Sequence, residues 1–184
     1  MKLIDMLWHC MALAMPGKLP QGHFASIFGT VIAGLHPESH RRYVMVEPQM
    51  GGWGATADKP RQHAMYSTNH GDTFNCPVEI AEARYGFDIL HKSLNTEQSM
   101  MASKPGGAGV SIAYQMRAPA VLSTGYSHAT EPVWSTDNGC EGGLNSLTIE
   151  RSDGRIDSMV YASGQSIEAG DIVHIRTACG GGSQ

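Results

Sequence analysis

A short run of polar side chains near the middle of the chain has the greatest capacity for chemistry. It holds one imidazole, His70, and three carboxylates, Asp72, Glu79 and Glu82, with the amide of Asn75 between them. An imidazole beside carboxylates can perform general acid–base catalysis, and carboxylate and amide oxygens are ligands for hard metal ions. We therefore take His70, Glu79 and Glu82 as candidate catalytic residues, and Asp72 and Asn75 as candidate substrate-binding residues.

A purely structural explanation of this polar run stays open. His70 and Asp72 would cap turns, Asn75 would cap the helix that follows, and Glu79 and Glu82 would place negative charge near its N-terminus. The helix dipole favours negative charge at that end. No spacing in the run matches a recognised metal-ligand motif.

A glycine-rich turn, GGWGA at residues 51–55, precedes the polar run. Backbone N–H groups in such a turn can bind a phosphate or carboxylate, so Gly52, Trp53 and Gly54 are further candidate substrate-binding residues. The alternative is a tight turn that Trp53 packs against a core, because isolated glycine clusters are weak motifs.

Two helices must position these residues. Apolar side chains in residues 3–15 recur with the spacing of an amphipathic helix, which Pro16 and Gly17 would end. A second, shorter helix is predicted for residues 77–84, with Gly86 as its natural stop.

Strands account for most of the rest. Residues 42–47 alternate as a strand does, and Pro48 is expected to end that strand. Residues 19–38 are expected to be irregular with one short strand. Further strands are predicted at 110–116, 120–123, 144–150, 157–162 and 172–176, with a hairpin turn at 152–155 and a flexible or partner-packed tail at 179–182. The pattern predicts an α+β, β-rich single domain over residues 1–184, with an N-terminal helix, a C-terminal set of short antiparallel strands and a soft boundary near residue 100.

Composition excludes several classes of function. The net charge is -4 and the 13 Lys and Arg residues are scattered, so there is no electrostatic footprint for nucleic acid or for a membrane surface. The apolar N-terminal stretch is interrupted by Asp5 and His9, and no signal-peptide cleavage site follows it. The four cysteines form no CxxC pair. We expect a cytoplasmic protein with neither nucleic-acid nor membrane partners.

Two phrases carry a resemblance to a known family. GGWGATADK at 51–59 and NCPVEIAEARYG at 75–86 are similar to the hydantoinase B family, the second component of ATP-dependent hydantoinases and oxoprolinases. The family also includes relatives of the large subunits of acetone and acetophenone carboxylases. The ending AGDIVHIRTACGGG resembles the C-terminus of the family. Because family members are about three times longer, as the resemblance implies, the chain looks like their C-terminal third.

The resemblance implies a small subunit of an ATP-dependent, multi-subunit hydantoinase/oxoprolinase-like amidohydrolase that opens a cyclic amide and is inactive alone. The implied partners are larger hydantoinase A-like and hydantoinase B N-terminal-like subunits, together with a small-molecule substrate. ATP, Mg and a divalent metal are expected in those partners. The chain alone is expected to bind no cofactor and to hold no complete metal site, since the metal-binding residues of the family belong to its N-terminal portion.

Other functions stay open at this point. The phrase KPGGAGVSIAYQ keeps the glycines of a family motif but lacks its arginine portion, which leaves the contacts of that arginine without a counterpart. The chain is equally compatible with a subunit of a related ATP-dependent ketone carboxylase, of the acetone or acetophenone type, and with a non-catalytic assembly subunit. A small-ligand-binding β domain without enzyme partners is a third class. The sequence alone does not name the substrate or the stoichiometry.

Overall fold

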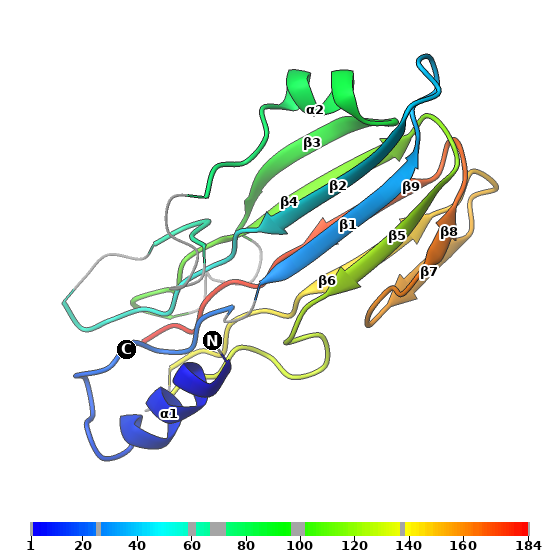
Figure 1. The fold of residues 1–184 in the computed structure, drawn as a ribbon. Coiled ribbons are helices and arrows are strands. Elements are labelled where there is room, and N and C mark those ends of the chain that lie inside the picture. Colours follow the sequence, from blue (N-terminus) through cyan, green and yellow to red (C-terminus); the bar gives the residue numbers. More distant parts are fainter. Residues whose placement is uncertain are drawn as a thin grey trace.

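The fold is an α+β arrangement dominated by two antiparallel sheets (Figure 1). The computed structural model describes residues 2–24, 27–58, 62–66, 73–96, 102–136 and 139–183. Its elements are α1 (Lys2–Ala12), β1 (Phe28–Leu35), β2 (Arg42–Gln49), α2 (Val78–Arg84), β3 (Phe87–Asn95), β4 (Gly109–Met116), β5 (Ala120–Gly125), β6 (Ser146–Glu150), β7 (Ile156–Met159), β8 (Gln165–Ile167) and β9 (Ile172–Arg176).

The strands are ordered β2-β1-β5-β8 in one sheet and β3-β4-β9-β6-β7 in the other. β3 and β4, which lie on either side of residue 100, pair antiparallel from Phe87 with Met116 to Asn95 with Gly109. Both halves of the sequence therefore share a sheet. This architecture confirms the predicted fold class.

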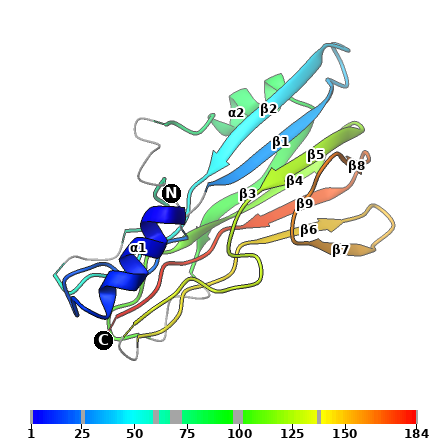
Figure 2. The same cartoon turned by 60° about the horizontal axis from the view of Figure 1, so that its bottom comes forward.

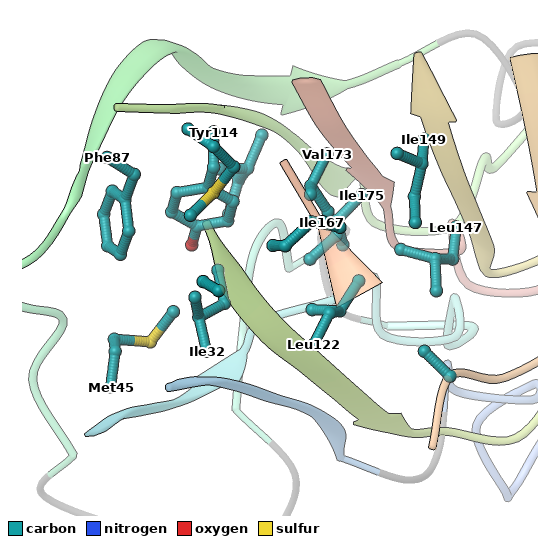
Figure 3. Packing of buried hydrophobic residues seen from close by; sticks show 14 of the residues in the cluster. Ile32, Met45, Phe87, Tyr114, Leu122, Leu147, Ile149, Ile167, Val173 and Ile175 are labelled. Carbon is teal, nitrogen blue, oxygen red and sulfur yellow. The ribbon is translucent and has the colours of Figure 1, made fainter. Parts of the chain in front are cut away.

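The hydrophobic core lies between the two sheets. Ile32 and Leu122 reach it from the four-stranded sheet, and Tyr114 and Ile175 from the five-stranded sheet (Figure 3). Along β1, buried and partly exposed residues alternate, as expected for a strand with one face on a core. A slip of one residue would exchange the two faces, so burial fixes the register.

β2 corrects one expectation, because the strand runs through Pro48 to Gln49 instead of ending before it. Pro48 lies opposite Gly29 of β1. β2 is an edge strand of its sheet, and at an edge the missing proline N–H removes no bond to a neighbour. The expected alternation is confirmed, since Tyr43 and Met45 are buried while Val44 and Val46 are exposed.

The expected strands differ from the observed ones in several further places: β6 begins at Ser146 instead of 144, and β7 ends at Met159 instead of 162. β1 occupies eight residues of the stretch that was expected to be largely irregular. β3 and β8 were not predicted at all. The SDGR hairpin is confirmed: Gly154 has φ of 85°, and the Arg151 N–H donates to the carbonyl of Arg155 at 2.7 Å.

The closing glycine run also corrects an expectation, because it is buried and hydrogen-bonded instead of being a flexible tail. The Gly180 N–H donates to the carbonyl of Gly107 at 3.0 Å, and the Gly52 N–H donates to the carbonyl of Ala178 at 2.9 Å. The backbones approach so closely that a Cβ at Gly52 would lie 1.9 Å from the Gly107 oxygen. Only glycine fits there.

The two helices lie in different places. α1 lies near the loops at the end of the molecule where both termini are found, while α2 lies along β3 (Figures 1 and 2). The predicted helix at 3–15 is confirmed over Lys2–Ala12. In the described part of the chain, no helix is long and apolar enough to cross a membrane.

Candidate functional site

A cavity of about 520 Å³ lies between α1 and the glycine turn at residues 51–55. α1 contributes Trp8, the segment that follows α1 contributes His23, and the turn contributes Trp53. The remaining lining residues are Gly17, Lys18, Pro20, Gly54, Thr56, Ala57, Asp58 and Gln62. A concave site with aromatic walls and a few polar groups, in this range of volume, is typical of small-ligand pockets.

His23 lines this cavity between two indole rings. Its imidazole stacks on Trp53 with ring centroids 4.9 Å apart, and the Trp8 ring meets it edge-on at 5.2 Å. The His23 Nδ1 accepts a hydrogen bond from the Gly54 N–H at 2.8 Å, so in the neutral ring the proton lies on Nε2. The orientation and the tautomer of His23 are therefore both fixed by the glycine turn.

His23 is neutral near pH 7. Only 6% of the residue is exposed, and this burial lowers the pKa of the imidazole to about 4, although the negative charge of Asp5 opposes part of that shift. Among the residues that the structure describes, none forms a hydrogen bond with the buried Nε2. His23 therefore holds a buried, uncharged N–H donor that has no partner among the described residues, and such a donor is costly to bury unless something completes its hydrogen bond.

The predicted residues Trp53 and Gly54 line the cavity, but the glycine turn does not offer an anion-binding nest. The Gly52 N–H donates to Ala178, the Trp53 N–H to Gln62 and the Gly54 N–H to His23. The indole Nε1 of Trp53 donates to the carbonyl of Tyr66 at 3.1 Å. The Gly51 and Ala55 N–H groups likewise donate to Met65 and Gly181, so all five backbone donors of the turn are used within the protein and its contribution to a site is the fixed face of Trp53.

Asn75 belongs to a second polar cluster. Its Oδ1 accepts a hydrogen bond from the Tyr66 hydroxyl. Burial raises the pKa of Tyr66, and the negative charge of nearby Glu47 raises it further. Glu47 also accepts a hydrogen bond from the Tyr114 hydroxyl at 3.1 Å and pairs with Lys92 at 3.4 Å. This cluster connects β2 to β3 and β4.

The structural alternative for Asn75, in which it caps the second helix, is wrong. The N-cap of α2 is Pro77, and no side chain caps that end of the helix. Asn75 is therefore hydrogen-bonded to Tyr66, whose hydroxyl lies close enough to the Glu47 carboxylate to be affected by its charge.

Glu79 and Glu82 lie on α2 and do not line the Trp53 cavity. The Glu82 carboxylate accepts a hydrogen bond from the Ile89 N–H at 2.8 Å, which ties α2 to β3. Glu79 is exposed in the first turn of α2. His70 and Asp72 lie outside the described residues, so their roles stay predictions.

No metal centre is evident in the part of the chain that the structure describes: there, no three His, Cys, Asp or Glu side chains are grouped closely enough to hold an ion. The cavity is aromatic, with Asp58 and His23 among its lining residues. His23 already uses its Nδ1 lone pair to accept from Gly54, so this imidazole has no free lone pair for a metal.

Trp8 and His23 were missed at the sequence level. His23 is 31 positions from Gly54, its hydrogen-bond partner, and no local spacing connects the two. Trp8 lies within the predicted helix, but the sequence draws attention to the apolar stripe of that helix and not to its other side.

Two packed antiparallel sheets define an α+β domain. At one end lie a helix and loops whose glycine segments are joined by backbone hydrogen bonds, and the candidate site lies among these loops. The family model for hydantoinase B/oxoprolinase matches residues 1–183, and the chain belongs to that family. The resemblance seen in the sequence phrases is thereby confirmed.

Three similar proteins show how much of a family member is represented here. An uncharacterized protein of Methanocaldococcus jannaschii is 25% identical over 181 residues, which are 98% of this chain and 31% of that protein. An acetone carboxylase, described as ATP-dependent and solved without nucleotide, has a TM-score of 0.73 at 10% identity, covering 96% of this chain and 28% of that one. An ATP-dependent caprolactamase from Pseudomonas jessenii has a TM-score of 0.71 at 14% identity, covering 91% and 30%. The chain thus spans about a third of the length of these proteins.

Proposed function

We propose that the chain is the small subunit of an ATP-dependent hydantoinase/oxoprolinase-like amidohydrolase that opens a cyclic amide. The observation that carries this proposal is the match of the family model to residues 1–183. The fold shared with an ATP-dependent caprolactamase, at a TM-score of 0.71, supports a lactam or related cyclic amide as the substrate class. The chain spans only 30% of that protein, and in this proposal the remaining functions are assigned to partner subunits.

We assign the steps of the reaction to different subunits of the assembled enzyme. ATP and Mg²⁺, bound by a hydantoinase A-like partner, would turn the amide oxygen into a better leaving group, and a divalent metal would belong to a hydantoinase B N-terminal-like partner. In this chain, the indoles of Trp8 and Trp53 form walls against which a small flat ring can pack. The neutral His23 uses Nδ1 to accept from Gly54 and keeps its Nε2–H buried, so a substrate carbonyl would accept from that donor once binding of substrate or partner uncovers it. Such contacts position a substrate without adding charge to the cavity.

The predicted residues outside the cavity complete the proposal. Asn75, beside Glu47 and Tyr66, would orient a second polar group of the substrate. His70 and Asp72 stay candidates from their chemistry. Glu79 presents an exposed carboxylate that a partner subunit can approach.

A His23→Asn substitution tests the role of the cavity. The Asn Oδ1 can still accept from the Gly54 N–H, whereas the Nε2–H donor is lost. In the assembled enzyme we expect kcat/KM for the cyclic amide to fall about tenfold, the effect of one lost hydrogen bond of about 1.4 kcal/mol. His174→Asn, on β9, is the matched control, and its kcat/KM should equal that of the wild type. Unchanged kcat/KM for His23→Asn in an intact complex would favour an assembly role without substrate contact.

A ketone carboxylase is the second candidate, favoured by the fold shared with acetone carboxylase at a TM-score of 0.73. The two functions differ in product. With ATP present, the purified complex should release a ring-opened amino acid from a lactam if it is an amidohydrolase. It should incorporate labelled bicarbonate into a ketone if it is a carboxylase.

A further inference from the structure

The outward face of α1 carries an apolar stripe that the rest of the domain does not bury. Leu3, Met6, Leu7 and Met11 are exposed by 79%, 55%, 56% and 40%. Cys10 is exposed beside them. The spacing i, i+3, i+4, i+7 and i+8 places these side chains on one side of the helix.

The opposite face of α1 is the one that packs on the domain, and it does so through polar and aromatic groups. Asp5 is only 4% exposed and accepts a hydrogen bond from the Trp134 Nε1 at 2.9 Å. The His9 ring stacks on Trp134 with centroids 4.4 Å apart, and Ala12 is buried. This is the reverse of an ordinary amphipathic surface helix, which turns its apolar stripe towards the core.

The position of α1 connects this stripe to the candidate site. Trp8, on the same helix, lines the cavity and contacts His23. In both views α1 lies beside the loops, at the end of the molecule away from α2 (Figures 1 and 2). A protein that covered the stripe would therefore also approach the cavity.

We propose that the apolar stripe of α1 inserts into an apolar groove on a separate chain, one that carries the part of the hydantoinase B family that this chain lacks. The five side chains have the spacing with which amphipathic helices dock into apolar grooves. This contact would place the reacting groups of the partner at the mouth of the cavity formed by Trp8 and Trp53. The inference rests on the proposed function, and it identifies the surface through which the subunits assemble.

Two observations favour this occupant over a second copy of the chain. An 11-residue helix is only about 16 Å long, so two α1 helices alone would bury much less than the roughly 800 Å² per partner of a stable interface. A partner that covers α1 and the rim of the cavity together can reach that area. In addition, the same fold accounts for only 28–31% of the similar proteins, so in each of them further polypeptide is available to cover such a face.

The test is purification from the native source through a tag at the C-terminus of the full chain, with mass spectrometry of the co-purifying chains. We expect a chain that matches the uncovered part of the hydantoinase B family, in equal molar amount. Leu7→Glu should lower its recovery at least tenfold, because the substitution places a charge in an apolar groove. Ile156→Glu on β7, at a side chain that is 65% exposed, is the control and should recover the partner normally. Both variants should keep the wild-type Tm, since both positions are exposed.

Three other results of the co-purification would each overturn a part of the proposal. Recovery of the family chain by Leu7→Glu at the wild-type level would overturn the docking surface and leave the proposed function standing. A homodimer that Leu7→Glu separates, with no family chain present, would overturn both the occupant and the subunit function. A single longer polypeptide that contains residues 1–184 would overturn the separate-chain assembly, although not the reaction.

Discussion

The core between the two sheets and the loops around the cavity are held together in different ways. We call the second region, where the segments around Gly52, Gly107 and Gly180 meet, the loop end. Ile32, Leu122 and Ile175 have no exposed surface and pack between the sheets through their side chains (Figure 3). At the loop end the contacts are between backbones: Gly52 bonds to Ala178, and Gly180 bonds to Gly107. The core is held by packed side chains, whereas the loop end adds close backbone–backbone contacts to its stacked rings, such as His23 on Trp53.

This difference predicts different sensitivities to substitution. A core of aliphatic side chains tolerates exchanges that conserve volume, because neighbouring side chains can adjust. Backbones in contact cannot move aside in the same way, so a single added methyl group at the loop end must displace a whole segment. The glycines of the loop end thus support the shape of the cavity without touching a ligand.

The largest expected effect is that of Gly52→Ala. The new Cβ would lie 1.9 Å from the Gly107 oxygen and 2.5 Å from the Gly180 nitrogen, both of them backbone atoms. We expect a loss of at least about 4 kcal/mol in the free energy of unfolding, or no folded protein. Urea denaturation followed by circular dichroism measures this loss.

Gly125→Ala is the matched control for that substitution. A Cβ at Gly125, at the end of β5, would meet no atom within 4 Å. Its free energy of unfolding should stay within about 0.5 kcal/mol of the wild type. If Gly52→Ala were equally stable, the close approach of the three backbones would be wrong.

The same contrast explains what could be predicted from sequence. The strands and turns of the sheets can be recognised from a few neighbouring residues. The alternation in residues 42–47 and the Asp-Gly turn at 153–154 are two such patterns, and both predicted elements that are observed. β3 was not predicted because its buried positions do not alternate regularly. Its register against β4 also shifts at residues 89–91.

The site was only partly predictable for a physical reason. Trp53 and Gly54, which line the cavity, drew attention in the sequence because glycines surround a tryptophan within one short phrase. His23 was not found, because its role depends on Trp8, Trp53 and Gly54, which the fold brings to it from separate segments. The inverted orientation of α1 depends in the same way on Trp134, which is 129 positions from Asp5.

An intermediate effect on stability is expected from the titration of His23. This residue lies only at the loop end, so its effect separates that region from the core. Its pKa is lowered from 6.5 to about 4 by burial, so below pH 6.5 the unfolded chain binds a proton that the folded chain does not. The contribution of His23 to the free energy of unfolding is therefore fully present above pH 6.5, and it is lost as the pH falls towards 4. Between pH 7 and pH 5 the loss should be about 2 kcal/mol.

Urea denaturation of the wild type and of His23→Asn at both pH values isolates that contribution. Asparagine does not titrate, so the variant should lack about 2 kcal/mol of the acid-induced loss, whatever its stability at pH 7. Parallel curves for the wild type and His23→Asn would show that His23 titrates normally and that the loop end is open to water.

The smallest effect is expected at Glu82, which belongs to the sheet region although it was predicted to be catalytic. Its carboxylate accepts the Ile89 N–H at 2.8 Å, and a glutamine can accept the same hydrogen bond. Glu82→Gln should therefore leave the free energy of unfolding nearly unchanged, whereas Glu82→Ala should lower it by about 1 kcal/mol by leaving that N–H without its acceptor. Glu79→Ala, at an exposed position on the same helix, is the control and should have no measurable effect on stability. A fall of kcat by about a hundredfold in Glu82→Gln, with stability unchanged, would instead assign acid–base chemistry to this carboxylate and bring α2 into the reacting site of the assembled enzyme.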